Sequence, residues 1–141
     1  MKPYRGKSKD KDKRWIYGWY SYNSKRDIHM ITEDNNGTWL VNGETVGQQV
    51  GLVDTKNKDF YKGDIFRVTL EAGECWEFVV HWDKRCAAWY ALPRNWKITE
   101  PQYPLHYYTD NINKNKVEII GNIHTENQNG KEENQKEEET R

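Results

Sequence analysis

Metal-binding and nucleophilic side chains lie close together in the sequence between residues 75 and 86. His81 and Asp83 are two positions apart and could supply two metal ligands from the end of a hairpin. A structural zinc site needs about four ligands, and no second cluster of such residues stands out. Cys75 and Cys86 lack a positioned base that the sequence reveals. We therefore expect no metal, no cofactor and no cysteine nucleophile.

Several carboxylates could act as general acids or bases. Glu71, Glu74 and Glu77 surround a predicted turn, and Asp54 and Asp59 flank another. Acid–base catalysis requires a carboxylate whose pKa is raised in an enclosed pocket, whereas carboxylates in Gly- and Lys-rich turns are usually hydrated. The sequence also holds no phosphate-binding glycine loop, no His-Glu-x-x-His pair and no nucleophile elbow. We expect a protein that is not an enzyme.

Asp64 follows Gly63 in the stretch DFYKGDIFRV, residues 59–68. A carboxylate on a glycine loop could be catalytic. The residues that follow alternate with a period of two, which is typical of a strand with one buried face. Glycine supplies unusual backbone angles, and aspartate can bond backbone amides two residues further on. We predict that Asp64 forms a turn and starts a strand.

Aromatic side chains point to a binding function instead. The chain has seven Trp and nine Tyr among 141 residues, and seven tryptophans cannot all fit inside one small barrel. Some must lie at the surface or in an interface, where Trp and Tyr are enriched. The candidate binding surface consists of Arg14, Trp15, Tyr17, Trp19, Trp96 and Tyr103. We expect it to bind protein, either another protein or a second copy of this chain in a homo-oligomer.

Nucleic acid is the alternative partner, and the less favoured one. Aromatics interleave with Lys and Arg over residues 13–17, a pattern that could stack on single-stranded bases. However, 22 Lys and Arg balance 22 Asp and Glu, and neutralising phosphates is the main source of nonspecific affinity. Residues 1–14 hold seven basic and two acidic side chains, and residues 126–141 hold three basic and six acidic ones. We interpret both segments as solvated ends.

Short strands predict an all-β fold with short helical turns. The segment 43–52 carries three glycines without a clean period, so we expect an irregular stretch with one helical turn. The segment 93–110 contains three prolines and predicts a long connection that serves as a lid or a contact surface. The predicted strands and hairpins are 14–22 with 28–31, 38–42, 65–70, 75–92 and 116–124.

The sequence predicts a cytoplasmic protein with no membrane partner. No apolar run approaches the ~20 residues of a spanning helix, and the N-terminus lacks an apolar signal segment. If Trp82 faces Cys86 across the hairpin of residues 75–92, Cys75 is too far away to form a disulfide. Two free thiols fit a reducing compartment.

Three stretches follow one another along the chain: KPYRGK with RWIYGWYSY, ETVGQQVGLVDTKNKDFYKGDIFRV, and VEIIGNIHTEN. In order and spacing they resemble segments of the YopX family of phage- and prophage-encoded proteins, and the resemblance runs from about Lys2 to Asn127. The motif positions are Gly47, Gln48, Gly51, Leu52, Tyr61, Gly63, Asp64, Ile65, Gly121 and Asn122. The resemblance implies a gene that acts in a bacterial cytoplasm, but it supplies no reaction, cofactor or partner.

The resemblance also implies an SH3-like small barrel around and after Gly63. We therefore expect residues 1–52 to form an N-terminal β layer packed on a barrel of residues 53–125, followed by a disordered charged tail at 126–141. The match at Lys2 to Lys7 implies an ordered strand there and not a free basic arm. The sequence departs from the family at Gln49-Val50 and after Asn127, where the family commonly continues with a leucine-rich end.

Overall fold

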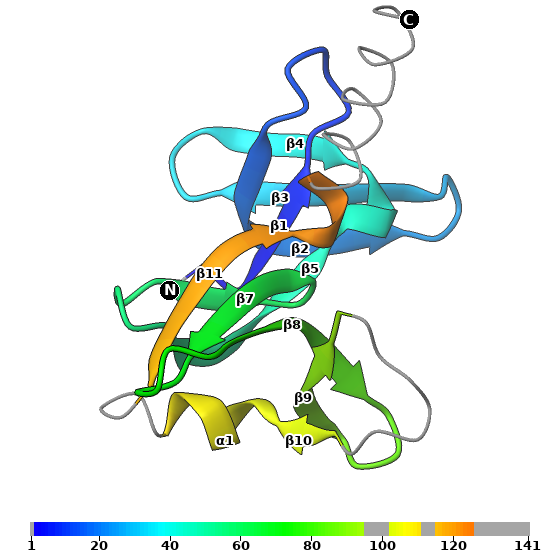
Figure 1. Cartoon of the computed structure of the whole chain (residues 1–141). Coiled ribbons are helices and arrows are strands. Elements are labelled where there is room, and N and C mark those ends of the chain that lie inside the picture. Colours follow the sequence, from blue (N-terminus) through cyan, green and yellow to red (C-terminus); the bar gives the residue numbers. More distant parts are fainter. Residues whose placement is uncertain (1, 95–101, 111–114, 126–141) are drawn as a thin grey trace, which may run out of the picture. The chain divides into compact units, whose positions relative to one another are not determined.

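The computed structural model describes residues 2–94, 102–110 and 115–125 (Figure 1). Its strands are β1 (Tyr4–Lys7), β2 (Trp15–Asn23), β3 (Ile28–Glu33), β4 (Gly37–Val41), β5 (Gly47–Val53), β6 (Asp59–Tyr61), β7 (Asp64–Thr69), β8 (Cys75–Asp83), β9 (Ala88–Pro93), β10 (Tyr103–Pro104) and β11 (Lys116–Asn122). A 3-10 turn (Gly43–Thr45) and a short helix α1 (Leu105–Thr109) accompany them. The all-β prediction is confirmed, and the SH3-like barrel stays a prediction.

The chain divides into two compact units, Met1–Val50 and Gly51–Arg141. The boundary falls inside β5. One sheet has the strand order β4-β3-β2-β1-β5-β6, and the other has the order β10-β9-β8-β7-β11. The predicted tail at 126–141 and part of the 93–110 connection lie outside the described residues.

The first four strands of the N-terminal unit form an antiparallel sheet that returns on itself. Ser8, just after β1, forms an isolated bridge with Val41 at the end of β4. The Lys9 N–H donates to the Leu40 carbonyl at 3.0 Å, and the Asn42 N–H donates to the Lys7 carbonyl at 2.8 Å. These bonds satisfy backbone groups that a free edge would leave open.

The core of this unit follows from the period of two along β2. Ile16 is buried there against Ile31 and Val41. Gly18 lies two residues further along β2, where a Cβ would stand 2.1 Å from the Thr32 carbonyl oxygen. Only glycine permits this close approach of two strands.

The prediction of an irregular stretch at 43–52 is wrong beyond its first residues. The helical turn is present at Gly43–Thr45, but Gly47–Val53 forms β5. Gly47 and Gln48 pair with Arg5 and Tyr4 of β1. This pairing forms the strand although the glycines obscure its period in the sequence. The predicted strand near Lys2 to Lys7 is confirmed as β1.

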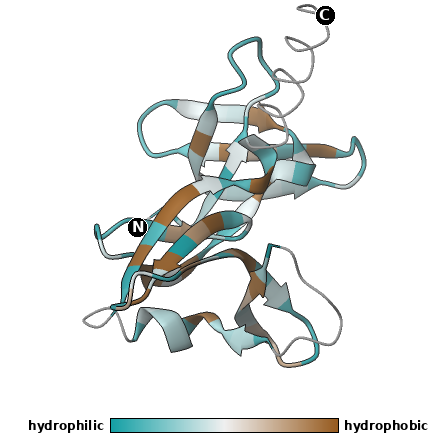
Figure 2. Cartoon of the chain, viewed as in Figure 1, coloured by the Kyte–Doolittle hydropathy of each residue, from teal (hydrophilic) through white to brown (hydrophobic). Residues whose placement is uncertain are grey.

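An aromatic core fills the C-terminal unit. Phe66 of β7 lies edge-on to Phe60 of β6 at 5.3 Å and stacks on Phe78 of β8 at 5.4 Å, between ring centroids. Tyr108 of α1 covers Phe78 at 4.6 Å, and burial raises the pKa of its phenol to about 12. Leu105 of α1 is fully buried. Figure 2 shows hydrophobic residues along β7 and β11 in the same unit.

Gly63 and Asp64 sit where the sequence predicts the start of a strand. Gly63 has a φ of 87°, in the left-handed region that favours glycine, and β7 begins at Asp64. The Asp64 carboxylate is 1% exposed and accepts the Tyr61 N–H at 2.8 Å. This donor precedes Asp64 by three residues.

The register expected for the β8–β9 hairpin is wrong. Trp82 pairs with Trp89, and Asp83 pairs with Ala88, so Cys86 lies in the loop. The loop extends to Ala87, which adopts a positive φ of 50°. Cys75 and Cys86 are both free, as predicted, and both are exposed.

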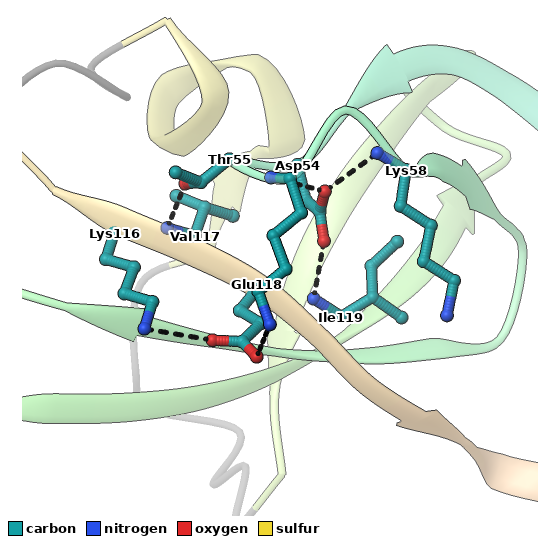
Figure 3. A network of polar contacts seen from close by, with 8 residues as sticks. Asp54, Thr55, Lys58, Lys116, Val117, Glu118 and Ile119 are labelled. Atoms are coloured by element: carbon teal, nitrogen blue, oxygen red, sulfur yellow. Dashed lines mark hydrogen bonds and ion pairs between the residues drawn. The ribbon is translucent and has the colours of Figure 1, made fainter.

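The turn at Asp54 caps the outer edge of β11 (Figure 3). Asp54 is 2% exposed, and its carboxylate accepts three backbone N–H groups, those of Lys56 and Lys58 at 2.9 Å and that of Ile119 at 3.0 Å. Thr55 completes the cap, because its N–H donates to the Val117 carbonyl and its hydroxyl accepts the Val117 N–H, both at 2.8 Å. The edge is therefore closed without another strand.

Charges of alternating sign cross the sheet from this turn to the end of β9. Glu118 accepts Lys56 at 2.9 Å and is the cross-strand neighbour of Arg67. Arg67 in turn pairs with Glu77 at 3.1 Å, and Arg94 reaches Glu77 from the other side at 2.5 Å. The two guanidinium groups, Arg94 first, lower the pKa of Glu77. This row favours one register, because a slip would separate the opposite charges that are paired across the strands.

We predict that Asp54→Asn lowers the free energy of unfolding by about 1–3 kcal/mol, because an amide nitrogen would face a backbone donor. Urea unfolding measures the loss. Asp59→Asn, an exposed aspartate near the same turn, should change stability by no more than about 0.5 kcal/mol. Equal unfolding midpoints for the two variants would contradict the role of Asp54.

We predict that Glu77 contributes to stability at neutral pH and that this contribution is lost in acid. Its pKa is lowered in the folded chain, so the contribution is complete above the ordinary glutamate pKa and disappears as the pH falls through the lowered value. Urea midpoints at pH 7 and in acid should fall less for Glu77→Gln than for wild type. Glu71→Gln, an exposed turn variant, should behave like wild type. A parallel decline for wild type and Glu77→Gln would refute the assignment.

Candidate binding surfaces

The structure brings three of the predicted surface residues together and separates the others. Trp15, Tyr17 and Trp19 occupy alternate positions of β2 and share its outward face. Tyr103 belongs to β10 in the C-terminal unit. Trp96 lies outside the described residues.

Arg14 belongs to a different environment from Trp15. Its guanidinium lies 4.5 Å from the ring centre of Trp39, a residue that packs on the N-terminal core. It also pairs with Glu33 at 3.4 Å. These contacts hold Arg14 on the other side of the strand.

Two cations from β1 join the outward face of β2. The register places Arg5 opposite Tyr17 and Lys7 opposite Trp15. The Arg5 guanidinium lies 4.7 Å from the Trp15 ring centre, and the Lys7 ammonium lies 5.6 Å from it, both within cation–π range. We call these two cations with Trp15, Tyr17 and Trp19 the N-terminal cation–aromatic face.

Exposure varies across this face. Trp19 is 63% exposed, whereas Arg5 and Lys7 are buried. Burial, and secondarily the charge of Lys13, lowers the pKa of the Lys7 ammonium. Sequence reasoning missed Arg5 and Lys7, although their alternation in KPYRGK, once the segment is expected to be a strand, places both on one side.

A second exposed surface crosses the edge of the C-terminal sheet. Trp82 and Trp89 form an edge-to-face pair with ring centres 5.0 Å apart. Tyr103 stacks on Tyr107 at 4.9 Å. The register connects the two pairs, because Tyr103 lies opposite Ala91, two residues along β9 from Trp89. We call these four residues the C-terminal aromatic surface.

The rings of the C-terminal aromatic surface remain open to solvent. Trp82, Tyr103 and Tyr107 are 37%, 43% and 51% exposed, and Trp89 is half-buried. Of the four, the sequence singled out Tyr103. The position of Trp82 at the end of a predicted strand, beside the turn, was a signal for its exposure, whereas the position of Tyr107 depends on α1.

One chain of polar contacts has the outline of a catalytic relay. The Tyr20 hydroxyl lies 2.6 Å from His29 Nδ1, and His29 Nε2 lies 3.8 Å from Asp27. A nucleophilic tyrosine needs a lowered pKa. The pKa of Tyr20 is instead raised, mainly by burial, and that of Tyr22 is raised by its hydrogen bond to Asp27. Both phenols therefore stay protonated, and the cluster supports the hairpin.

The other candidate reactive groups have structural surroundings. Asp83 accepts the Arg85 N–H at 2.9 Å, which is a turn contact. Among residues 2–94, 102–110 and 115–125, no three His, Cys, Asp or Glu side chains are grouped to hold a metal. Within the same ranges no helix is long and apolar enough to cross a membrane.

Comparison with known proteins identifies the family. Neither a search of curated proteins nor a search of solved structures returned a match. A model of the YopX protein family matches residues 3–129, which include all of the three stretches that resemble it except Lys2. The chain therefore belongs to the YopX protein family.

Proposed function

We propose that this chain is a phage- or prophage-encoded accessory protein that binds protein in the bacterial cytoplasm and catalyses no reaction. Membership of the YopX family supports the phage origin. The observation that carries the binding function is the C-terminal aromatic surface, where four rings from three strands and a helix gather at the edge of one sheet.

Covering these rings would be favourable. Aromatic side chains contribute much of the energy of protein interfaces, with tryptophan and tyrosine most often at the centre. Removing a further ~50 Å² of each ring from water would contribute about 1 kcal/mol per ring. Four rings together could supply a substantial part of a moderate affinity.

The surface is also organised before it binds. Trp82 and Trp89 restrain each other on paired strands, and Tyr103 and Tyr107 restrain each other by stacking. Side chains that already hold their rotamers lose less entropy when a partner covers them. Ring contacts, and not conformational change, are therefore the proposed source of affinity.

The partner is expected to contact side chains and not to extend the sheet. The edge strand β10 is two residues long and ends in Pro104, which lacks a backbone donor. Short edges and proline are devices that prevent strand addition. The partner is another protein or a second copy of this chain.

We predict that the double variant Trp82→Ala, Tyr107→Ala loses its partner. Tagged wild type and variants would be captured from infected or lysogenic cells and the bound proteins quantified. The double variant should retain less than about one tenth of the bound partner, because it lacks two interface rings. Trp76→Ala removes a ring that is more exposed than either of these, elsewhere on the sheet, and should retain the partner. Equal recovery of the partner with wild type, the double variant and Trp76→Ala would contradict the proposal.

We predict self-association if the partner is a second copy. Light scattering across a concentration series should show an average mass that rises for wild type and stays at the mass of one chain for the Trp82→Ala, Tyr107→Ala variant. Trp76→Ala serves again as the matched control. A wild type that remains monomeric at the highest concentration would remove the homo-oligomer and leave another protein as the partner.

A further inference from the structure

We propose that the N-terminal cation–aromatic face and the loop that leads into it bind single-stranded nucleic acid, with bases on the rings and phosphates near the exposed Lys9, Lys11 and Lys13. This is a second site and a second class of ligand, independent of the protein contact at the C-terminal aromatic surface. Three features of the surface indicate this class of ligand: the spacing of the rings, the cations beside them and the local charge.

The rings have the spacing of a stacking platform. Trp15, Tyr17 and Trp19 follow one another at every second residue of β2, so adjacent rings stand about 6.7 Å apart along the strand. Single strands expose the faces of their bases, and aromatic side chains on a sheet can stack on successive bases. Trp19, at 63% exposure, offers the most accessible ring.

The cations distinguish this face from a protein interface. Arg5 and Lys7 lie beside the Trp15 ring but are buried. Phosphate contact therefore falls to Lys9, Lys11 and Lys13, which are exposed in the loop that leads into β2. Lysine is depleted in protein interfaces, whereas Lys and Arg interleaved with aromatics are typical of surfaces that follow a nucleic-acid backbone.

Charge complementarity supports a polyanion. Residues 1–14 carry seven basic and two acidic side chains, and residues 1–50 carry nine and six. Asp10 orders this loop, because its carboxylate accepts the Ser8 hydroxyl at 2.6 Å and the Asp12 N–H at 3.2 Å. Salt screens charges beyond about 8–10 Å, so the charges nearest to a ligand decide its attraction more than the balanced charge of the whole chain does.

A duplex fits the observations less well. Its bases are stacked and paired, so the rings of a sheet face cannot reach their faces without unstacking them, at a cost of a few kcal/mol. Phosphate contact from the loop lysines would remain, but the rings would contribute nothing. Preference for single strands is thus the signature of this site.

Fluorescence anisotropy with labelled oligothymidylate, oligouridylate and a duplex of equal length tests the proposal on the full chain. The wild type should bind both single strands at low salt and bind the duplex more weakly. Trp19→Ala should weaken single-strand binding roughly tenfold, whereas Trp19→Phe should keep most of it. Trp76→Ala, which removes an exposed tryptophan from the C-terminal unit, should bind as wild type does.

A charge variant tests the same site without touching the sheet. The triple variant Lys9→Gln, Lys11→Gln, Lys13→Gln should reduce the slope of log affinity against log salt by about 2, since each phosphate contact on a single strand contributes roughly 0.7. The matched control Lys58→Gln, Lys62→Gln, Lys84→Gln removes the same charge from exposed positions of the C-terminal unit and should leave the slope unchanged. Circular dichroism would establish that each variant keeps the β spectrum of wild type.

Three results would overturn the proposal. One is no binding of either single strand at low salt. Another is equal binding of duplex and single strand with no effect of Trp19→Ala, which would reveal attraction of charge alone. The last is an equal loss in the matched control variants, which would place the contact elsewhere.

Discussion

Two small sheets have too little interior volume to bury all the large aromatic rings of this chain. This shortage of volume determines both how the cores are built and which rings lie at the surface. Few aliphatic side chains are available, so phenylalanines form the centre of the C-terminal unit, with Phe60 and Phe66 fully buried. Trp19 and Trp76 remain more than half exposed. The same composition that builds the cores therefore leaves rings at the surface, and surface rings of this size are a common basis of recognition.

Two strand edges have their backbone N–H and C=O groups satisfied, so that aromatic rings are more available for contact than these edges are. The Asp54 turn occupies the open donors of β11, and the bonds between the end of β4 and the residues after β1 satisfy another edge. A row of alternating charges keeps one face of the C-terminal sheet polar. A sheet protein with exposed aromatics needs such devices, because open edges would lead to aggregation.

Local signals in the sequence predicted the strands but not every partner of each strand. β-favouring aromatics revealed β2, alternation revealed β7, and the glycine before Asp64 marked the start of β7, because these signals are local in the sequence. β5 was missed because its pairing with β1 joins residues more than forty positions apart. The β8–β9 register was wrong because the loop is longer than expected. The loop extends to Ala87, whose positive φ cannot be anticipated from an alanine in the sequence.

The sequence predicted that aromatic residues form the candidate surfaces, but it did not predict all the residues that belong to each surface. Trp15, Tyr17 and Trp19 share a face because alternate residues of any strand do. Arg14 adjoins them in sequence but lies against Trp39, whereas Arg5 and Lys7 join them across the β1–β2 pair. Cross-strand register decides such neighbours, and a single sequence specifies register only weakly.

Hydroxyl-radical footprinting of the dilute chain, read by mass spectrometry, tests the central claim that surplus rings are accessible outside the cores. The account predicts that Trp19 and Trp76 are oxidised much faster than Trp39, which is half-buried against the N-terminal core. Protection of Trp19 and Trp76 equal to that of Trp39 would show that the rings are enclosed, and it would contradict the account.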